Sequence, residues 1–236
     1  MIQRRSIVWF VVIAFSLAWV LFLLPLRAGD PTSLSRQTVT TFAWAAAMWA
    51  PGLAAILVTR FVDRESLATL NLTHLGDLRV YLWAWLAPFV LALLAGVATW
   101  LLGLGKLDLE FQQLREAMAQ TPGGSQASVQ TVVGIQIAAA LSFAPLINML
   151  FALGEELGWR GYLLPKLLPL GQGKAILFSG VIWGLWHAPA ILQGHNYPSQ
   201  PVLGVFLMVV FCVLLGAFLS WLYLRTRSPW APALAH

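Results

Sequence analysis

Three charged side chains stand in an otherwise apolar stretch, LFALGEELGWRGYLLP, at residues 150–165. Glu156 and Arg160 are four residues apart, in the order that favours an ion pair along a helix. Glu155 would point about 100° further round the same helix, where the neighbouring sequence offers it no partner of opposite charge. A carboxylate that no structural role explains is a candidate for chemistry, because a buried glutamate can act as a general base.

Two histidines can complete a site with Glu155. His187 ends the stretch SGVIWGLWH, four residues after Trp183, and His236 stands at the end of the sequence. A carboxylate and two imidazoles in an enclosed site can activate a water molecule and stabilise an oxyanion. The alternative is structural, because a lone histidine in a membrane is often a packed residue and a Glu–Arg pair can serve as scaffolding. The joint occurrence of these groups favours a catalytic site made of Glu155, His187 and His236.

Glycines flank both polar groups at helical spacing, and small residues let two helices approach closely. They are Gly154 and Gly158 beside the glutamates, and Gly180 and Gly184 on the face of His187. The two segments are consecutive, so we expect them to run antiparallel and to bring their polar groups together.

The elements that position these residues are predicted to be membrane-spanning helices. The chain is 59% hydrophobic and 10% charged, whereas soluble domains are about one quarter charged. Six apolar runs approach or exceed the ~18–20 residues that cross a bilayer as helix. They are residues 7–24, 39–58, 80–104, 131–153, 175–193 and 202–224. Alternating strands typical of a barrel are absent from the sequence, so the prediction is an all-α, polytopic helical bundle in a single membrane domain, residues 1–236.

The two ends of the chain raise separate questions. Arg4 and Arg5 precede the first apolar run, but no small-residue cleavage site follows it, so we interpret it as an anchor rather than a signal peptide. Near the other end, Ser228 suits a helix N-cap and Pro229 the first helical position. Only eight residues follow Ser228, so a seventh span is expected to be truncated.

The basic residues indicate an orientation rather than a nucleic-acid partner. With the N-terminus in the cytoplasm, ten of the fourteen lysines and arginines fall in inside segments and four in outside loops. Residues 105–130, which include TPGGSQAS, and residues 194–201 would then face outward. We expect an integral protein of a prokaryotic plasma membrane with a cytoplasmic N-terminus.

The motifs resemble those of the CPBP family, which comprises type II CAAX prenyl proteases and bacteriocin-processing or self-immunity (Abi) proteins. EELGWR matches the family's E-E-x-x-x-R motif, and WGLWH at 183–187 fits its F-x-x-x-H motif with tryptophan in place of phenylalanine. SPWAPALAH resembles the start of a third motif, a histidine followed four residues later by asparagine. That asparagine would fall after residue 236, and the resemblance covers residues 131–236.

The resemblance implies an intramembrane endopeptidase and a role for each matching residue. Glu155 would be the general base, His187 would help to bind the water, and His236 would stabilise the oxyanion. Glu156 and Arg160 would hold the site together. Trp183 would support it from the position of the family's phenylalanine.

The cofactor and the substrate stay open at this point. The family includes proteases described as glutamate-dependent and as metal-dependent, and the sequence has no H-E-x-x-H zinc motif. We therefore expect no obligatory cofactor, with zinc held by Glu155, His187 and His236 as the alternative. The expected partners are the lipid bilayer and a peptide or protein substrate, lipidated or not. A transporter or self-immunity protein that uses the same polar cavity without catalysis is the competing function.

Overall fold

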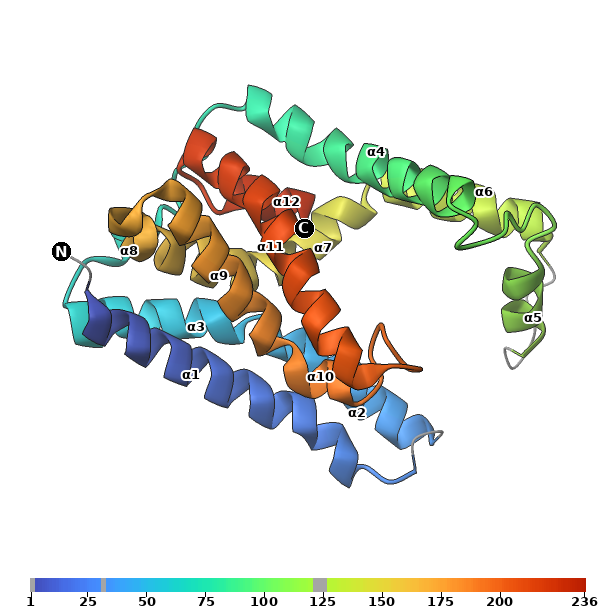
Figure 1. The fold of residues 1–236 in the computed structure, drawn as a ribbon, viewed down its shortest axis with the longest axis horizontal. Helices are drawn as coiled ribbons and strands as arrows, with labels where there is room; N and C mark the ends of the chain where they lie inside the picture. The colour runs from blue at the N-terminus through green and yellow to red at the C-terminus, as the bar shows by residue number, and fades with distance from the viewer. Residues whose placement is uncertain (1–2, 31–32, 121–126) are drawn as a thin grey trace.

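The computed structural model describes residues 3–30, 33–120 and 127–236. All regular structure in these ranges is helical, which confirms the predicted all-α helical bundle. The first half of the chain runs from α1 to α5 (Figure 1). Its elements are α1 (Arg4–Leu23), η1 (Leu24–Arg27), α2 (Leu34–Ala47), α3 (Ala50–Leu57), η2 (Val58–Asp63), η3 (Leu67–Leu70), α4 (Arg79–Leu101) and α5 (Gln112–Gln120).

The second half contains the elements that carry the charged motif and the two histidines. They are α6 (Val129–Leu141), α7 (Ala144–Glu156), η4 (Leu157–Leu163), α8 (Leu164–Leu167), η5 (Leu168–Leu170), α9 (Gln172–Trp186), α10 (Ala188–Leu192), α11 (Pro201–Thr226) and α12 (Trp230–Ala235). Helix α5 lies within the loop expected at 105–130, and the six residues 121–126 of that loop lie outside the described residues.

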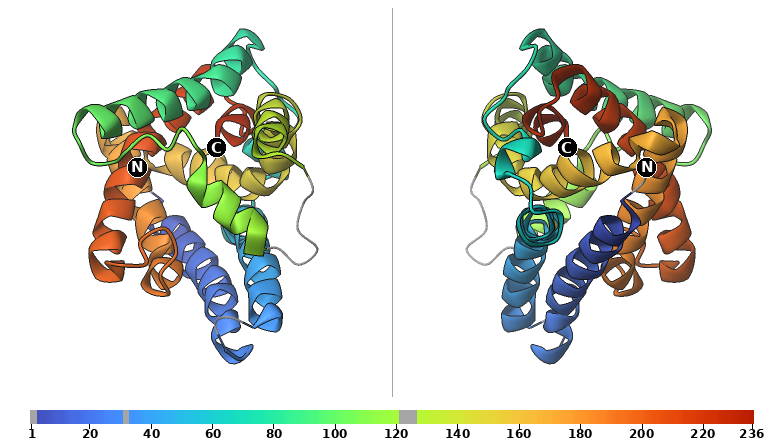
Figure 2. Two further views of the ribbon diagram at one scale, coloured as in Figure 1. Left: turned by 90° about the vertical axis from the view of Figure 1, so that its right-hand side faces the viewer. Right: turned by 90° about the vertical axis from the view of Figure 1, so that its left-hand side faces the viewer.

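The helices form a packed body from which α4 and α6 extend. Helix α1 lies beside α2 and α3, and α9 packs along α11 (Figure 1). Helix α4 crosses the top of the molecule in Figure 1, where its far end overlaps α6, but the turned views of Figure 2 show that the two lie apart. Helix α12 packs against α7, α4 and α11, so the last residues of the chain are held in the middle of the bundle.

Two helices are interrupted at a proline. Helix α3 begins at Ala50 with Pro51 in its first turn, and α7 begins at Ala144 with Pro145 in its first turn. Proline cannot donate a backbone hydrogen bond and its ring clashes with the preceding turn, so an unbroken helix is disfavoured at both places. The break between α6 and α7 bends the chain by 54°.

Fewer helices than predicted are long and apolar enough to cross a membrane. In the described residues there are four: Arg4–Arg27, Leu34–Asp63, Arg79–Leu101 and Pro201–Thr226. A fifth exists if the bent pair Val129–Leu141 and Ala144–Leu170 counts as one span. The prediction of six complete spans is therefore not confirmed.

The run predicted to span at 175–193 is divided between two short helices. Helix α9 has 15 residues and ends before His187, and α10 begins at Ala188 with Pro189 in its first turn. The ring of Pro189 cannot continue the hydrogen-bond ladder of α9, which accounts for the break. In the segment predicted to start a seventh span, the Ser228 hydroxyl accepts a hydrogen bond from the Trp230 N–H at 3.3 Å, and α12 follows.

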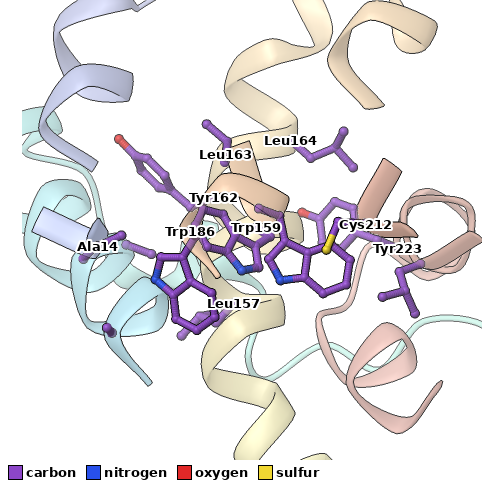
Figure 3. Close-up of a cluster of buried hydrophobic side chains, with 14 of the residues drawn as sticks. Ala14, Leu157, Trp159, Tyr162, Leu163, Leu164, Trp186, Cys212 and Tyr223 are labelled. Carbon is purple, nitrogen blue, oxygen red and sulfur yellow. The ribbon is translucent and has the colours of Figure 1, made fainter. Parts of the chain in front are cut away.

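An aromatic core joins the amino-terminal helices to the charged motif. The rings of Trp159 and Trp186 meet edge to face at 6.0 Å, and Phe10 of α1 meets Trp159 at 5.5 Å. Tyr162 and Cys212 belong to the same cluster (Figure 3). Because tryptophan and tyrosine bury large rigid surfaces, this cluster fixes the segment that carries the motif against the rest of the bundle.

Candidate active site

The last turn of α7 and the following π-helix, η4, carry the charged motif. Glu155 and Glu156 end α7, and Arg160 lies within η4. All three are buried: Glu155 is 3% exposed, Glu156 0% and Arg160 1%. A π-helix is less favourable than an α-helix and is often found at functional sites.

Glu156 is held by two partners through one oxygen. Arg160 Nη1 lies 2.6 Å from Glu156 Oε1, which is the ion pair expected from their spacing. His236 Nδ1 lies 2.8 Å from the same oxygen. A carboxylate only accepts hydrogen bonds, so Nδ1 of His236 donates, and Nε2 is left free for another partner. The interaction joins α12 to α7 across 80 residues of sequence.

Arg160 is further enclosed by Trp183 and by α11. Its guanidinium carbon lies 4.3 Å from the centre of the Trp183 ring, close enough for a cation–π interaction. A Cβ atom at Gly216 of α11 would come within 3.2 Å of Arg160 Nη2. The glycine therefore provides the room in which the guanidinium lies.

Glu155 has a partner that its own helix could not supply. The indole N–H of Trp183 donates to Glu155 Oε2 at 2.7 Å, from 28 residues further along the chain. In the described residues no donor reaches the other oxygen, Oε1, and that oxygen is not fully enclosed. Glu156 differs, because its second oxygen, Oε2, is completely buried and has no partner among the residues that the structure describes.

His187 stands at the break between α9 and α10, beside Trp183 and Trp186. Its Nδ1 lies 2.9 Å from the Trp183 carbonyl oxygen, which can only accept, so Nδ1 donates; in the neutral form of the ring, Nε2 then carries the lone pair. The ring centre lies 4.8 Å from that of Trp186 and 5.9 Å from that of Trp183. His187 is near enough to Glu155 and His236 to interact with both electrostatically.

The structure thus brings Glu155, His187 and His236 together around Trp183. The rings of Trp183 and His236 meet edge to face with their centres 5.3 Å apart, and the indole N–H of Trp183 binds Glu155. The sequence motif suggested only a supporting role for this tryptophan. A hydrogen-bond donor four residues before His187, on the same helical face, was the signal that could have identified the partner of Glu155.

The sequence suggested that the glycine faces of the two polar segments pack directly against each other. In the structure each glycine face packs against a different neighbour. A Cβ atom at Gly154 would come within 2.6 Å of Trp49 Cα, and one at Gly158 within 2.6 Å of the Pro51 carbonyl carbon. The neighbour of this face is therefore the α2–α3 junction. The glycines of α9 face α11: Cβ atoms there would come within 2.7 Å of Val213 Cα from Gly180 and 2.5 Å of Val209 Cα from Gly184.

A pocket of about 270 Å³ opens beside His236. Apolar side chains of α4, α7 and α12 line most of it, and the amide of Asn148 is a polar group in its wall. Asn148 precedes Glu155 by seven residues on α7, which is about two helical turns. The pocket can hold an apolar group next to a histidine nitrogen and an amide.

The alternative zinc site would use the same residues. In the part of the chain that the structure describes, no group of three or more His, Cys, Asp and Glu side chains is arranged to hold a metal ion. Glu155, His187 and His236 do not form such a group as they lie in the structure.

Two comparisons with known proteins agree with the motifs. A family model described as type II CAAX prenyl endopeptidase Rce1-like matches residues 136–236. CAAX prenyl protease 2 of Methanococcus maripaludis is 31% identical over 116 residues, which are 45% of this chain and 41% of the relative. The chain thus spans less than half the length of this curated relative. The resemblance to the CPBP family is confirmed, and the matched family segment contains the buried charges, Trp183 and the two histidines of the site.

Proposed function

We propose that this chain, a membrane protein whose C-terminal part is similar to type II CAAX prenyl endopeptidases, hydrolyses a peptide bond with a water activated by Glu155. The observation that carries the proposal is the difference between the two glutamates. In the described residues, Glu155 has an oxygen that lacks a donor and is not completely enclosed, whereas the oxygens of Glu156 are either bound or enclosed.

The first step is the attack of water on the scissile carbonyl carbon. Glu155 Oε1 takes one proton from the water, whose oxygen forms the new bond to carbon. His187 Nε2 accepts a hydrogen bond from the second hydrogen of the water and orients it. The carbonyl oxygen becomes the oxyanion of a tetrahedral intermediate.

His236 is placed to stabilise this oxyanion through Nε2–H. Two ionised glutamates beside one arginine leave a net negative charge, which a protonated His236 balances. The Nδ1–H of His236 donates a hydrogen bond to Glu156. The intermediate then collapses as the C–N bond breaks. Glu155 gives its proton to the leaving nitrogen, so the products are a carboxylic acid and an amine.

The substrate is proposed to be a peptide or protein, bound in part in the pocket beside His236. The apolar walls suit an apolar side chain or a lipid group on the substrate, and the Asn148 amide can bind a peptide carbonyl or N–H. A membrane-embedded pocket is reached from the lipid, so a membrane-anchored substrate meets it without leaving the bilayer.

Glu155→Gln tests the proposal. In purified protein reconstituted in liposomes, cleavage of a fluorogenic CAAX peptide should fall about 100- to 10,000-fold, the usual contribution of a general base. Glu65→Gln is the matched control, because Glu65 is 39% exposed and its charged partner is Lys166 rather than a residue of the site. Prenylated and unprenylated forms of the peptide, tested in parallel, decide whether lipidation is required. Unchanged cleavage by Glu155→Gln would refute the mechanism, and peptide binding without cleavage by the wild type would favour the transporter or immunity alternative.

We further propose that the reaction needs no obligatory metal, because a carboxylate with a histidine can activate water unaided. Metal content of the purified, active protein, measured by mass spectrometry, checks this. Stoichiometric zinc that is lost together with activity on chelation would contradict it.

A further inference from the structure

A second pocket, of about 270 Å³, lies at the other side of α4, away from the site. Its lining comes from the start of α4 and the end of α11: Asp77, Arg79, Val80, Trp83, Trp221 and Arg225. Both helices are long and apolar enough to span a membrane, so their charged ends lie where hydrocarbon meets water.

The two helices contribute the same pair of residue types. Arg79 precedes Trp83 by four residues on α4, and Arg225 follows Trp221 by four residues on α11. At this spacing each arginine lies on the same helical face as its tryptophan. Trp83 is 62% exposed and Trp221 37%, so both indoles face the surrounding lipid, one helical turn closer to the bilayer centre than the arginines.

Close packing holds the two helix ends together. Gly76, at a φ of +71°, lies against the backbone of Thr226, where a Cβ atom would come within 2.7 Å of Thr226 Cα. The Tyr81 hydroxyl donates to the Leu75 carbonyl at 3.0 Å and lies 3.4 Å from the Ser228 hydroxyl. The pocket is therefore a fixed feature of the fold.

The charges of the pocket leave one positive charge in excess. Throughout residues 3–30, 33–120 and 127–236, neither Arg79 nor Arg225 forms an ion pair. The one carboxylate in the lining, Asp77, accepts a hydrogen bond from the Arg79 backbone N–H at 2.9 Å and so caps the start of α4. Two guanidinium groups against one carboxylate favour a ligand with a net negative charge.

We propose that this pocket binds an anionic phospholipid. The phosphodiester lies between Arg79 and Arg225, whose planar donor groups match phosphate oxygens. The glycerol and the upper parts of the acyl chains lie against Trp83 and Trp221. A basic pocket between spanning helices at the membrane surface is the setting in which such headgroups bind. A zwitterionic lipid carries its own cation and gains less from the excess charge.

The test is native mass spectrometry of the purified protein in detergent, titrated with phosphatidylglycerol or phosphatidylcholine. We expect one phosphatidylglycerol to bind in preference to phosphatidylcholine. Arg79→Gln/Arg225→Gln should weaken this binding about thirtyfold, from the usual contribution of two basic residues near a membrane surface. Arg4→Gln/Arg5→Gln removes the same charge from exposed positions on α1 and should change the binding less than about threefold.

Two further measurements show whether binding needs the acyl chains and whether the variants remain equally folded. Inorganic phosphate and glycerophosphoglycerol, added in excess, should not displace the lipid, since they lack the chains that lie on the tryptophans. The thermal unfolding midpoints without added lipid should be equal in the wild type and both double variants, because all four arginines are exposed. Equal weakening in both double variants, equal binding of the two lipids, or displacement by the soluble phosphates would overturn the proposal.

Discussion

Among single residues, Glu155 and Glu156 are nearly equal in burial and differ mainly in their partners. Glu155 accepts one hydrogen bond from a neutral indole, while Glu156 accepts from a guanidinium and an imidazole. A charge-assisted network of this kind is strong when complete and costly when one member is lost. The two glutamates should therefore respond differently to the same substitution.

Replacing Glu156 by glutamine should lower stability more than it changes the chemistry of Glu155. The change leaves Arg160 buried without its counter-charge, for which the usual cost is about 3–5 kcal/mol. The loss should be visible as a lower midpoint of thermal aggregation in membranes or detergent. Glu65→Gln is again the control, because Glu65 is 39% exposed and its contact with Lys166 is long, 3.5 Å. A midpoint for Glu156→Gln equal to that of the control would mean that the buried pair contributes nothing to folding.

Some of this residue-level detail follows from the sequence and some does not. Helical spacing predicts the Glu156–Arg160 pair, because both members lie on one segment. The bond from Trp183 to Glu155 joins segments 28 residues apart, and that from His236 to Glu156 joins segments 80 apart. Such contacts depend on how the helices are rotated and offset against each other, which no local spacing specifies.

At the scale of helices, glycine governs how closely α7 approaches its neighbour. The face with Gly154 and Gly158 lies directly on the backbone of the α2–α3 junction, where Pro51 interrupts the helix. Close contact between backbones replaces side-chain packing there. The position of α7, and with it the depth of Glu155, depends on this contact.

Gly154→Ala should therefore be destabilising although alanine is the better helix former. Its methyl group would meet the Trp49 Cα at 2.6 Å, and overpacking of this kind usually costs about 1–3 kcal/mol. Gly134→Ala on α6 is the matched control, since nothing lies within 4 Å of its added methyl group. Unfolding midpoints of the two variants check the expectation, and equal midpoints would show that α7 can shift without cost.

The apolar runs of the sequence predicted which segments are helical, but three of the six runs, 39–58, 131–153 and 175–193, are each divided between two helices. Alternating long apolar and polar stretches are enough to predict a bundle of spanning helices. The division of the 175–193 run at His187 and the π-helix that holds Arg160 were missed. A π-turn adds one residue to a helix without changing its composition, so neither hydropathy nor periodicity reveals it.

For the whole molecule, the distribution of basic residues predicts that the N-terminus is cytoplasmic. In a Cys212→Ala background, Gln113→Cys should react with a membrane-impermeant maleimide in intact cells. His74→Cys should react only after permeabilisation. Both positions are exposed, so accessibility within the protein does not limit either reaction. The reverse pattern of labelling would invert the orientation.

The short length of α9 also bears on the bilayer itself. Its 15 residues are about 22 Å long, against about 30 Å for the hydrocarbon layer, while the 26 residues of its neighbour α11 reach about 39 Å. Such hydrophobic mismatch thins the bilayer beside the shorter helix, and this thinning costs fractions of a kcal/mol per Å. The protein should then be sensitive to acyl-chain length. Reconstituted in phosphatidylcholine with 14-carbon or 22-carbon chains, it should unfold at a higher temperature in the thinner membrane, whose thickness is closer to the length of α9.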